Sequence, residues 1–251
     1  RFFVLVRRAA SSTGRCIAVN DATLVRSDVV TATRGSNIGM GGPAMIEGGG
    51  LGVFAPEDIG PVEVQVAGGV VDVLVDDEAA AVAVAKQYLS YFAGSAPTVP
   101  ETWECADQAA LRDLVPENRR RVYDVRSVID TVADTGSVLE LRAGFGLGMI
   151  TALARVEGRP LGMVANNPAH LAGAIDSDGA DKAARLLQLC DAFDLPLLFL
   201  CDTPGIMVGP EAETTGLVRH ASRLCVTGAS LTVPCATIIL RKGYGLGAQA
   251  M

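Results

Sequence analysis

The stretch of sequence that decides the fold is Leu195-Pro-Leu-Leu-Phe-Leu-Cys-Asp-Thr-Pro-Gly-Ile-Met-Val-Gly209, together with Ala236-Thr-Ile-Ile-Leu-Arg-Lys-Gly-Tyr-Gly-Leu-Gly-Ala-Gln-Ala-Met251. Each begins as an apolar run and stops at a glycine turn. Two buried strands that end side by side would place backbone N–H groups at one edge of a sheet. Such groups stabilise an enolate or oxyanion without a charged side chain.

Helix and strand patterns alternate through residues 123–251. Helices are predicted over residues 124–133, 178–193 and 217–226, and strands over 137–142, 149–156, 160–166, 195–201 and 235–241. The pair Glu157-Gly158 between two of these strands indicates a hairpin. This alternation predicts an α/β fold with a largely parallel core.

Residues 1–95 form the first predicted unit. A strand is expected at 29–33, a loop or close-packed turn at 37–52, and a helix from 76 to 92. The runs 62–66 and 70–75 around Gly68-Gly69 predict a hairpin. Residues 96–122 are expected to be a linker, because they are rich in turn-forming and charged residues. The glycine-rich strand-to-turn pattern recurs in both units, which suggests two related halves.

The composition argues against several classes of protein. A formal net charge of −7 argues against a nucleic-acid partner, which requires a basic face. The two histidines are isolated and the six cysteines lack CxxC spacing, so no metal site is expected. The apolar runs are well short of the ~20 residues of a membrane helix, so no membrane partner is expected. Buried free thiols at Cys190, Cys201 and Cys235 suit a reducing cytoplasm.

The ends of the sequence suggest a piece of a longer chain. The sequence begins without methionine and stops at Met251, directly after a glycine turn. We therefore expect that residues are missing at both ends.

Several motifs leave alternatives open when each is taken alone. The segments 202–209 and 243–250 are also compatible with ordinary turns after strands. The second contains a GxGxxA pattern, a weak sign of a nucleotide site because a Rossmann unit places it after its first strand. His170 is the nearest side-chain acid or base and is more typical of a structural histidine. Arg119–Arg121 is typical of a solvated run, with phosphate binding as the alternative.

Four blocks together resemble the carboxyltransferase β-type subunit of acetyl- or propionyl-CoA carboxylase, a branch of the crotonase superfamily. The blocks are Asn37–Gly50, Tyr123–Ile129, Gly158–Gly173 with its continuation through Lys182–Arg185 and Cys190–Phe193, and the pair 195–209 and 236–251. The resemblance implies a crotonase/ClpP-like ββα superhelix with parts of two related domains. Residues 1–95 would end a first, acyl-CoA domain, and residues 123–251 would begin a second, biotin domain.

The resemblance implies a carboxyltransferase that moves a carboxyl group from carboxybiotin to the α-carbon of a short acyl-CoA. In such an enzyme, backbone amides would stabilise two enolates, one on the thioester and one on the biotin ureido group, and no side chain would act as an acid or base. The resemblance also implies a homo-oligomer of dimer pairs, with a biotin carboxylase and a biotin carrier as partners. Lys86, Lys182 and Lys242 lack the preceding methionine that biotin attachment needs, so biotin is expected on a partner.

By position, the resemblance assigns roles to individual residues. The amides of Leu246 and Gly247 would form the oxyanion hole of the second domain, and those of Ala18 and Val19 would form the hole of the first. The biotin side would be shaped by Thr203, Pro204, Gly205 and Gly245. Gln249 would select the acyl chain. The turn at Ala18-Val19 departs from the glycine that is usual in the family.

Three other functions remain open at this stage. A biotin-dependent acyl-CoA decarboxylase subunit uses the same fold. A crotonase-type hydratase or hydrolase requires a carboxylate pair, for which Glu47 and Asp202 are poor candidates. The third is an inactive, truncated paralogue with a structural role, which Val19 and Asp21 in the first-domain turn favour.

Overall fold

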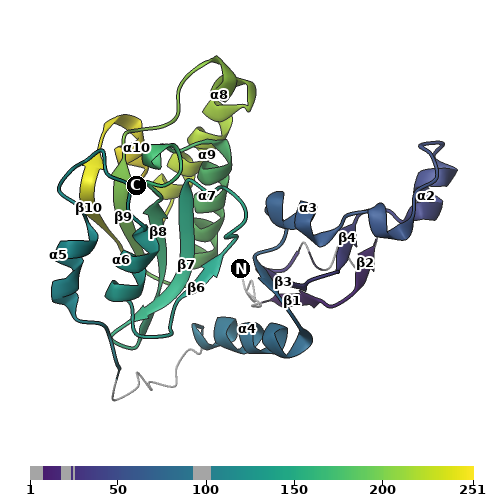
Figure 1. Cartoon of the computed structure of the whole chain (residues 1–251), viewed down its shortest axis with the longest axis horizontal. Helices are drawn as coiled ribbons and strands as arrows, with labels where there is room; N and C mark the ends of the chain where they lie inside the picture. Colours follow the sequence, from purple (N-terminus) through teal and green to yellow (C-terminus); the bar gives the residue numbers. More distant parts are fainter. Residues whose placement is uncertain (1–7, 18–23, 25, 93–102) are drawn as a thin grey trace. The chain divides into compact units, whose positions relative to one another are not determined.

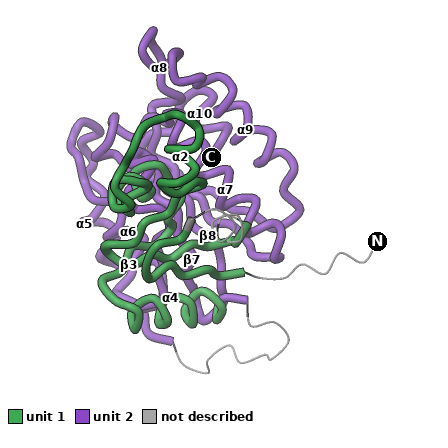
Figure 2. Tube along the Cα trace, turned by 90° about the vertical axis from the view of Figure 1, so that its right-hand side faces the viewer, with its two compact units in different colours: residues 1–90 green, residues 91–251 purple. Residues whose placement is uncertain are grey.

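The computed structural model describes residues 8–17, 24, 26–92 and 103–251 of the chain (Figure 1). The chain divides into two compact units, residues 1–90 and 91–251 (Figure 2). Each unit has its own sheets and its own apolar core.

The second unit is built on a five-stranded sheet in the order β10-β9-β8-β7-β6. Its strands are β6 (Leu139–Leu141), β7 (Met149–Val156), β8 (Arg159–Asn166), β9 (Leu197–Thr203) and β10 (Cys235–Gly243). β8, β9 and β10 run parallel, whereas β7 is antiparallel to both of its neighbours. The strands predicted in residues 123–251 are therefore confirmed, and the carboxyl ends of β9 and β10 meet at one end of the sheet.

The β7–β8 hairpin turns at Glu157-Gly158, as predicted. Both residues have positive φ, 52° and 74°, which matches a two-residue type I′ turn. The Asp134 carboxylate accepts hydrogen bonds from both turn amides, at 2.9 Å from Glu157 N and 2.7 Å from Gly158 N. These bonds offset the cost of placing a glutamate in the left-handed region.

The helix α6 (Val125–Val132) packs on one face of the sheet. The Asp124 carboxylate caps it by accepting a hydrogen bond from Arg126 N at 3.0 Å. Its buried side chains Val125, Val128 and Ile129 join an apolar cluster with residues of β7, β8 and β9. Burial of this apolar face, rather than helix propensity alone, stabilises so short a helix.

The helix α7 (Ser177–Ala192) is capped by Asp176, whose carboxylate accepts a hydrogen bond from Gly179 N at 2.8 Å. Gly162 of β8 allows the helix to approach the sheet, since a Cβ there would overlap the sulfur of Cys190. Burial raises the pKa of the Cys190 thiol to about 12, so Cys190 remains a thiol at neutral pH.

Short helices surround this core. They are η2 (Gln108–Ala110), α5 (Leu111–Leu114), η3 (Leu171–Gly173), α8 (Pro210–Thr214), α9 (Leu217–Ala229) and α10 (Gly245–Ala250). α9 packs beside α7, and α10 lies against α9. Leu111, Leu114 and Val115 pack on the core, so part of the segment predicted as a linker is folded onto the second unit. Within the described ranges, none of the helices combines the length and apolar character of a membrane span.

The first unit holds two small parallel sheets. β1 (Ala9–Ser12), β3 (Val29–Thr33) and β5 (Val73–Val75) form one in the order β1-β3-β5, and β2 (Arg15–Ile17) pairs with β4 (Asn37–Gly39) in the other. Its helices include α2 (Pro43–Gly48), η1 (Pro56–Asp58), α3 (Val62–Ala67) and α4 (Glu78–Ser90). α4 packs on the three-stranded sheet and buries Ala81 and Tyr88.

Two predictions for the first unit are wrong. Residues 62–66 lie in the helix α3 and not in the first arm of a hairpin, and β5 pairs in parallel with β3. Gly68-Gly69 ends α3: Gly69 has φ of 72°, and Val70 N donates back to Gln65 O. The hairpin prediction is wrong because a pair of glycines is equally compatible with the end of a helix and with the turn of a hairpin. The run 37–52, predicted as a loop, contains β4 and α2.

β10 is more exposed than the sequence predicts. Most of β9 is buried, but the first five residues of β10, Cys235–Ile239, are exposed. The prediction of buried thiols is therefore confirmed for Cys190 and Cys201 and wrong for Cys235. β10 forms an edge of the described sheet, and an edge strand has a neighbour on one side alone.

Lys182 of α7 is a charged group in the core. Its side chain is buried, and Nζ donates a hydrogen bond to Phe145 O at 2.9 Å. Burial lowers the pKa of this ammonium from 10.5 to about 8, and the nearby Glu140 carboxylate opposes this effect. Folding therefore favours the neutral amine.

Replacement of Lys182 by methionine is expected to remove a pH-dependent contribution to stability. Because the pKa of Lys182 is lower in the folded chain than in the unfolded chain, its contribution to stability is fully present above the unfolded pKa of 10.5. This contribution is lost as the pH falls through the folded pKa of about 8. The free energy of unfolding of the wild type, minus that of Lys182→Met, should rise by about 3 kcal/mol from neutral to strongly alkaline pH. Urea denaturation over a pH series measures this difference, and a flat profile would contradict the burial of the charge.

Candidate active site

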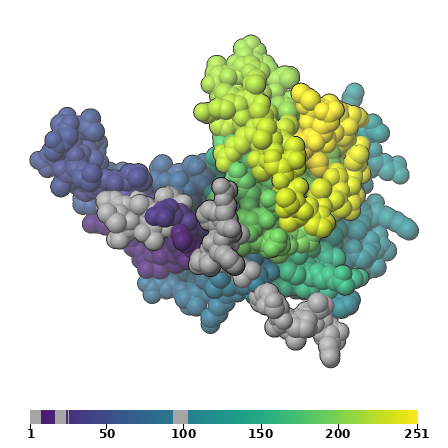
Figure 3. Space-filling view, turned by 180° about the vertical axis from the view of Figure 1, so that it is seen from behind, coloured from purple at the N-terminus to yellow at the C-terminus, as the bar shows by residue number. Residues whose placement is uncertain are grey.

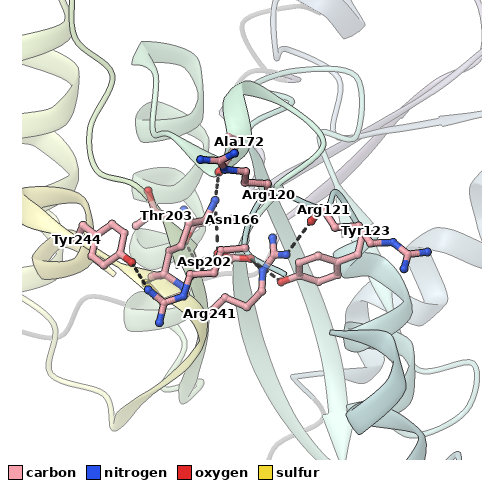
Figure 4. Close-up of polar contacts among 12 residues, drawn as sticks. Arg120, Arg121, Tyr123, Asn166, Ala172, Asp202, Thr203, Arg241 and Tyr244 are labelled. Carbon is pink, nitrogen blue, oxygen red and sulfur yellow. Dashed lines mark hydrogen bonds and ion pairs between the residues drawn. The ribbon is translucent and has the colours of Figure 1, made fainter. Parts of the chain in front are cut away.

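The two turns that follow β9 and β10 lie side by side at the carboxyl end of the sheet. Gly243 pairs with Thr203, and Tyr244 N donates a hydrogen bond to Thr203 O at 3.2 Å. Thr203 and Tyr244 lie close together in Figure 4. The juxtaposition of the two glycine turns, predicted from sequence, is confirmed by this pairing.

Hydrogen bonds fix the turn after β9 in one conformation. Gly205 has φ of 133°, which a residue with a side chain rarely adopts. Thr203 Oγ1 accepts a hydrogen bond from Gly205 N at 3.1 Å and lies 3.0 Å from Gly205 O, to which it donates. Gly205 O also accepts a hydrogen bond from Ile175 N at 3.1 Å. The turn therefore presents a preorganised backbone beside β10.

The residues after β10 form the helix α10 and not a simple glycine turn. Its first turn approaches the β9 turn so closely that a Cβ at Gly247 would lie 2.6 Å from Gly205 C and 2.7 Å from Gly205 Cα. Ala248 N donates to Tyr244 O, and the amides of Leu246 and Gly247 precede this bond. The first-turn amides of a helix have no acceptor within the helix. These two amides can therefore bind an oxygen of a ligand.

An apolar pocket of about 590 Å³ opens beside the first turn of α10. It is lined by Pro204, Gly205, Ile206, Met207, Val208 and Glu213, by Leu217, Val218, Ala221, Ser222, Cys225 and Val226 of the α9 helix, and by Gly245 and Leu246. Figure 3 shows the segments that carry its walls, α8–α9 and the carboxyl-terminal segment, adjacent on the surface. A weakly polar environment strengthens a hydrogen bond from an amide to a charged oxygen.

The structure gathers most of the predicted second-domain residues at this pocket. Pro204, Gly205, Gly245 and Leu246 line it, and Thr203 and Gly247 contact the Gly205 backbone without lining the pocket. Thr203 is buried beneath the turn, where it shapes the backbone. Gln249 is exposed on α10 and is not one of the described residues that line the pocket. Ala18 and Val19 lie outside the described residues, so the first-domain oxyanion hole stays a prediction.

A buried carboxylate precedes the β9 turn. Asp202 is completely buried and accepts hydrogen bonds from Tyr123 Oη at 2.9 Å, Arg241 Nε at 2.8 Å and Lys242 N at 3.2 Å. Figure 4 shows Tyr123 and Arg241 converging on Asp202. Burial, and then the negative charge of Asp202, raise the pKa of the Tyr123 hydroxyl, which therefore stays protonated and donates its hydrogen bond.

Sequence reasoning missed two features around the pocket. The first is Arg241, whose signal is a basic pair at the end of an apolar strand, opposite an acid on the neighbouring strand. The second is an exposed apolar stripe on α9, where Val218 and Val226 are 68% and 65% exposed. Residues eight apart lie on one face of a helix, so the signal was present in the sequence.

Side chains that could bind a metal or act as an acid or base are sparse near this pocket. In the described part of the chain, no group of three or more His, Cys, Asp and Glu side chains could hold a metal ion. His170 Nε2 lies 3.4 Å from Asp176 Oδ2. The structural role expected for His170 stays a prediction.

Residues 10–251 match the family described as carboxyl transferase domain. Among solved structures, the chain is similar to a single-chain, multi-domain long-chain acyl-CoA carboxylase, with 56% identity and a TM-score of 0.93. This match covers 98% of the chain and 25% of that structure. The transcarboxylase 12S structure with methylmalonyl-coenzyme A and methylmalonic acid bound is 33% identical, with a TM-score of 0.89, over 98% of this chain and 49% of that one.

Curated relatives extend well beyond the matched region. The biotin-dependent long chain acyl-coenzyme A carboxylase beta4 subunit of Mycobacterium tuberculosis is 33% identical over 98% of this chain and 49% of its own length. The methylmalonyl-CoA carboxyltransferase 12S subunit of Propionibacterium freudenreichii subsp. shermanii is 32% identical over 98% of this chain and 48% of its own length. The chain thus spans about half the length of these two relatives.

Gly247→Ala is expected to destabilise the second unit, because the added methyl group would overlap the Gly205 backbone. Overpacking of this kind costs about 1–3 kcal/mol. The matched control is Gly228→Ala in α9, where a Cβ would meet Leu187 Cδ2 at an ordinary 3.9 Å. Chemical denaturation should show a loss for Gly247→Ala and no loss for Gly228→Ala. Equal stability of the two variants would contradict the close approach.

Proposed function

This chain belongs to the carboxyl transferase domain family, and we propose that it forms part of a biotin-dependent enzyme that transfers a carboxyl group from carboxybiotin to the α-carbon of an acyl-CoA. The resemblance to carboxyltransferase subunits of acyl-CoA carboxylases is confirmed by the family match and by the solved relatives. The α/β, crotonase-like fold is confirmed by TM-scores of 0.93 and 0.89 to carboxyltransferase structures.

The observation that carries the proposal is the pair of first-turn amides beside the apolar pocket. The amides of Leu246 and Gly247 precede the first hydrogen bond of α10, and Leu246 lines the pocket. Gly247 is held against Gly205, so the donors are fixed before a ligand arrives. Preorganised donors of this kind stabilise a developing negative charge, and removal of one costs about 10²–10³ in kcat.

The pocket suits a ligand such as biotin, in which an apolar sulfur-containing ring and an alkyl chain adjoin a polar ureido ring with one carbonyl oxygen. Its volume of about 590 Å³ is typical of small-molecule sites, and its walls are mostly apolar. When bound, carboxybiotin supplies the carboxyl group that is transferred. The proposed task of this chain is to hold the ring against Pro204 and Gly245, and to donate hydrogen bonds from Leu246 and Gly247 to the carbonyl oxygen.

The acyl group of the substrate has two candidate lengths. The sequence resemblance favours a short acyl-CoA of the acetyl or propionyl type, with Gln249 as the selecting residue. The 56% identity to a long-chain acyl-CoA carboxylase favours a long acyl chain instead. Gln249 is exposed on α10, one turn from the proposed donors, and is accessible to a substrate in either case.

The proposed partners follow from the relatives. The 12S relative was solved as a hexamer that forms a multienzyme core. We infer that this chain also acts within a homo-oligomer, with biotin delivered by a carrier and charged by a biotin carboxylase. The location of such an enzyme in the cytoplasm stays a prediction from the cysteine content.

The alternatives differ in what they require of the site. A decarboxylase uses the same donors in the reverse direction, so the direction of transfer must be measured. A hydratase or hydrolase needs a carboxylate over the thioester, but Asp202 is completely buried and bound to Arg241. An inactive paralogue would not need backbone donors that are fixed in place, as the Gly247 amide is by its contact with Gly205. Ala18 and Val19 lie outside the described residues, so activity measurements must decide on this alternative.

The full-length parent protein is expected to carboxylate free biotin when it is given malonyl-CoA or methylmalonyl-CoA. Gly247→Val should abolish this activity because its side chain would overlap the Gly205 backbone and displace the donors, and Gly205→Val should abolish it because valine does not adopt the φ of 133° on which the turn depends. Gly228→Ala is the control and should keep it. The rate of thioester-dependent biotin carboxylation is the measurement, and undiminished turnover by a folded Gly247→Val variant would refute the oxyanion assignment.

Gln249→Ala in the same protein is expected to change the preference among acyl-CoA substrates more than the rate with the best one. A side chain that contacts the acyl group discriminates by about 1–3 kcal/mol, or roughly 10- to 200-fold in kcat/KM. Competition between acetyl-, propionyl- and long-chain acyl-CoA measures the ratio directly. An unchanged ratio would remove Gln249 from the selecting site.

A further inference from the structure

β10 loses its register with β9 just before the candidate site. Between the pairs Ile239–Cys201 and Gly243–Thr203, residues 240–242 of β10 lie opposite the single residue Asp202. An irregularity of this kind interrupts the ladder of backbone hydrogen bonds and bends the strand. The direction in which β10 enters α10 therefore depends on what holds this irregularity.

The Asp202 carboxylate occupies the gap in the ladder. Its Oδ1 accepts a hydrogen bond from Lys242 N at 3.2 Å, so a side chain replaces the missing backbone acceptor. Its Oδ2 accepts a hydrogen bond from Arg241 Nε at 2.8 Å. On the other side, Asp202 N donates to Asn166 Oδ1 at 3.0 Å, which links Asp202 to β8. Asp202 thus connects three neighbouring strands: its carboxylate binds β10, and its backbone N–H binds a side chain of β8.

The two basic side chains extend this connection to the loops around the sheet. Arg241 Nη1 donates to Asn118 O at 3.1 Å and to Arg121 O at 2.7 Å. Lys242 Nζ donates to Ala172 O at 2.7 Å, and Ala172 has an unfavourable positive φ of 54°. Asp202, Arg241, Arg121 and Ala172 are all labelled in Figure 4. Loss of the carboxylate would leave two buried cations without their anion.

We propose that Asp202 is a positioning residue: its carboxylate holds the irregular register of β10 and thereby aims the amides of Leu246 and Gly247 at the pocket. This role rests on the proposed carboxyltransferase function. Asp202 is completely buried, so it acts through Arg241 and Lys242 and not by contact with a substrate.

Asp202→Asn in the full-length protein tests this role, because it keeps the shape of the side chain but turns an acceptor into a donor. Hydrogen–deuterium exchange of residues 243–251 should rise by roughly tenfold, while exchange within α7 stays unchanged. The kcat of biotin carboxylation should fall by about 10²-fold, with KM for the acyl-CoA nearly constant, because misplaced donors act on the transition state.

Tyr123→Phe is the matched control. It removes one hydrogen bond to the same carboxylate but keeps the ring beneath Arg241, whose guanidinium carbon lies 4.5 Å from the ring centre. Both contacts of Asp202 with β10 remain, so exchange of residues 243–251 and kcat should stay close to wild type. A loss in Tyr123→Phe as large as that in Asp202→Asn would overturn the proposal.

A second variant separates positioning from stability. Adding Arg241→Gln to Asp202→Asn removes one unpaired buried cation and should recover thermal stability without recovering kcat. Recovery of both would mean that Asp202 is only structural, and unchanged exchange and kcat in a folded Asp202→Asn would also overturn the proposal. If Asp202→Asn does not fold, Asp202→Glu can replace it, because it moves the carboxylate by the length of one methylene group. Unchanged hydrogen–deuterium exchange of residues 243–251 in Asp202→Glu would likewise overturn the proposal.

The two proposals fail in different ways. A wild-type protein that carboxylates no biotin with malonyl-CoA, methylmalonyl-CoA or a carboxylated long-chain acyl-CoA would refute the proposed function. The exchange measurement would still decide whether Asp202 holds the end of β10, because it needs no activity.

Discussion

The contact between the Gly247 and Gly205 backbones is the constraint on which the candidate site depends. A Cβ at position 247 would overlap the Gly205 backbone, so this residue must be glycine, and the φ of 133° makes glycine necessary at position 205 as well. This contact in turn requires that β9 and β10 are neighbours, that they end together, and that α10 starts at once. Side chains are excluded from the point of closest approach, and the chemistry offered there is that of backbone amides.

Local rules explain the parts of the fold that could be predicted from sequence. The hairpin at Glu157-Gly158 depends on the conformation of these two turn residues and on the Asp134 carboxylate that binds their amides. The β9 and β10 strands follow from apolar runs that end at glycines, and their pairing follows from the parallel α/β pattern. The residue roles at the pocket came from family resemblance instead, because no local rule distinguishes an ordinary turn from an oxyanion hole.

Features that depend on distant partners could not be predicted. Asp202 meets Arg241 and Tyr123, which are 39 and 79 residues away in the sequence. The sequence shows an acid at the end of one strand and a basic pair at the end of another, but no periodicity encodes which of these side chains meet. The wrong hairpin at 62–75 has a different cause: Gly68-Gly69 obeys the rules for a helix end and for a turn equally well, and packing decides between them. The exposure of β10 likewise depends on which strand lies at the edge.

The position of β10 at the edge of the described sheet has a consequence for how this sheet can be extended. Its residues 235–240 contain neither a charged side chain nor a proline, and Ile238 and Ile239 are 48% and 62% exposed. Proteins that keep an edge strand open normally protect it with such residues. An unprotected edge recruits further strands, whether from a proper partner or from a neighbouring molecule of the same kind. The sheet of the second unit is therefore suited to extension at β10 by a further strand.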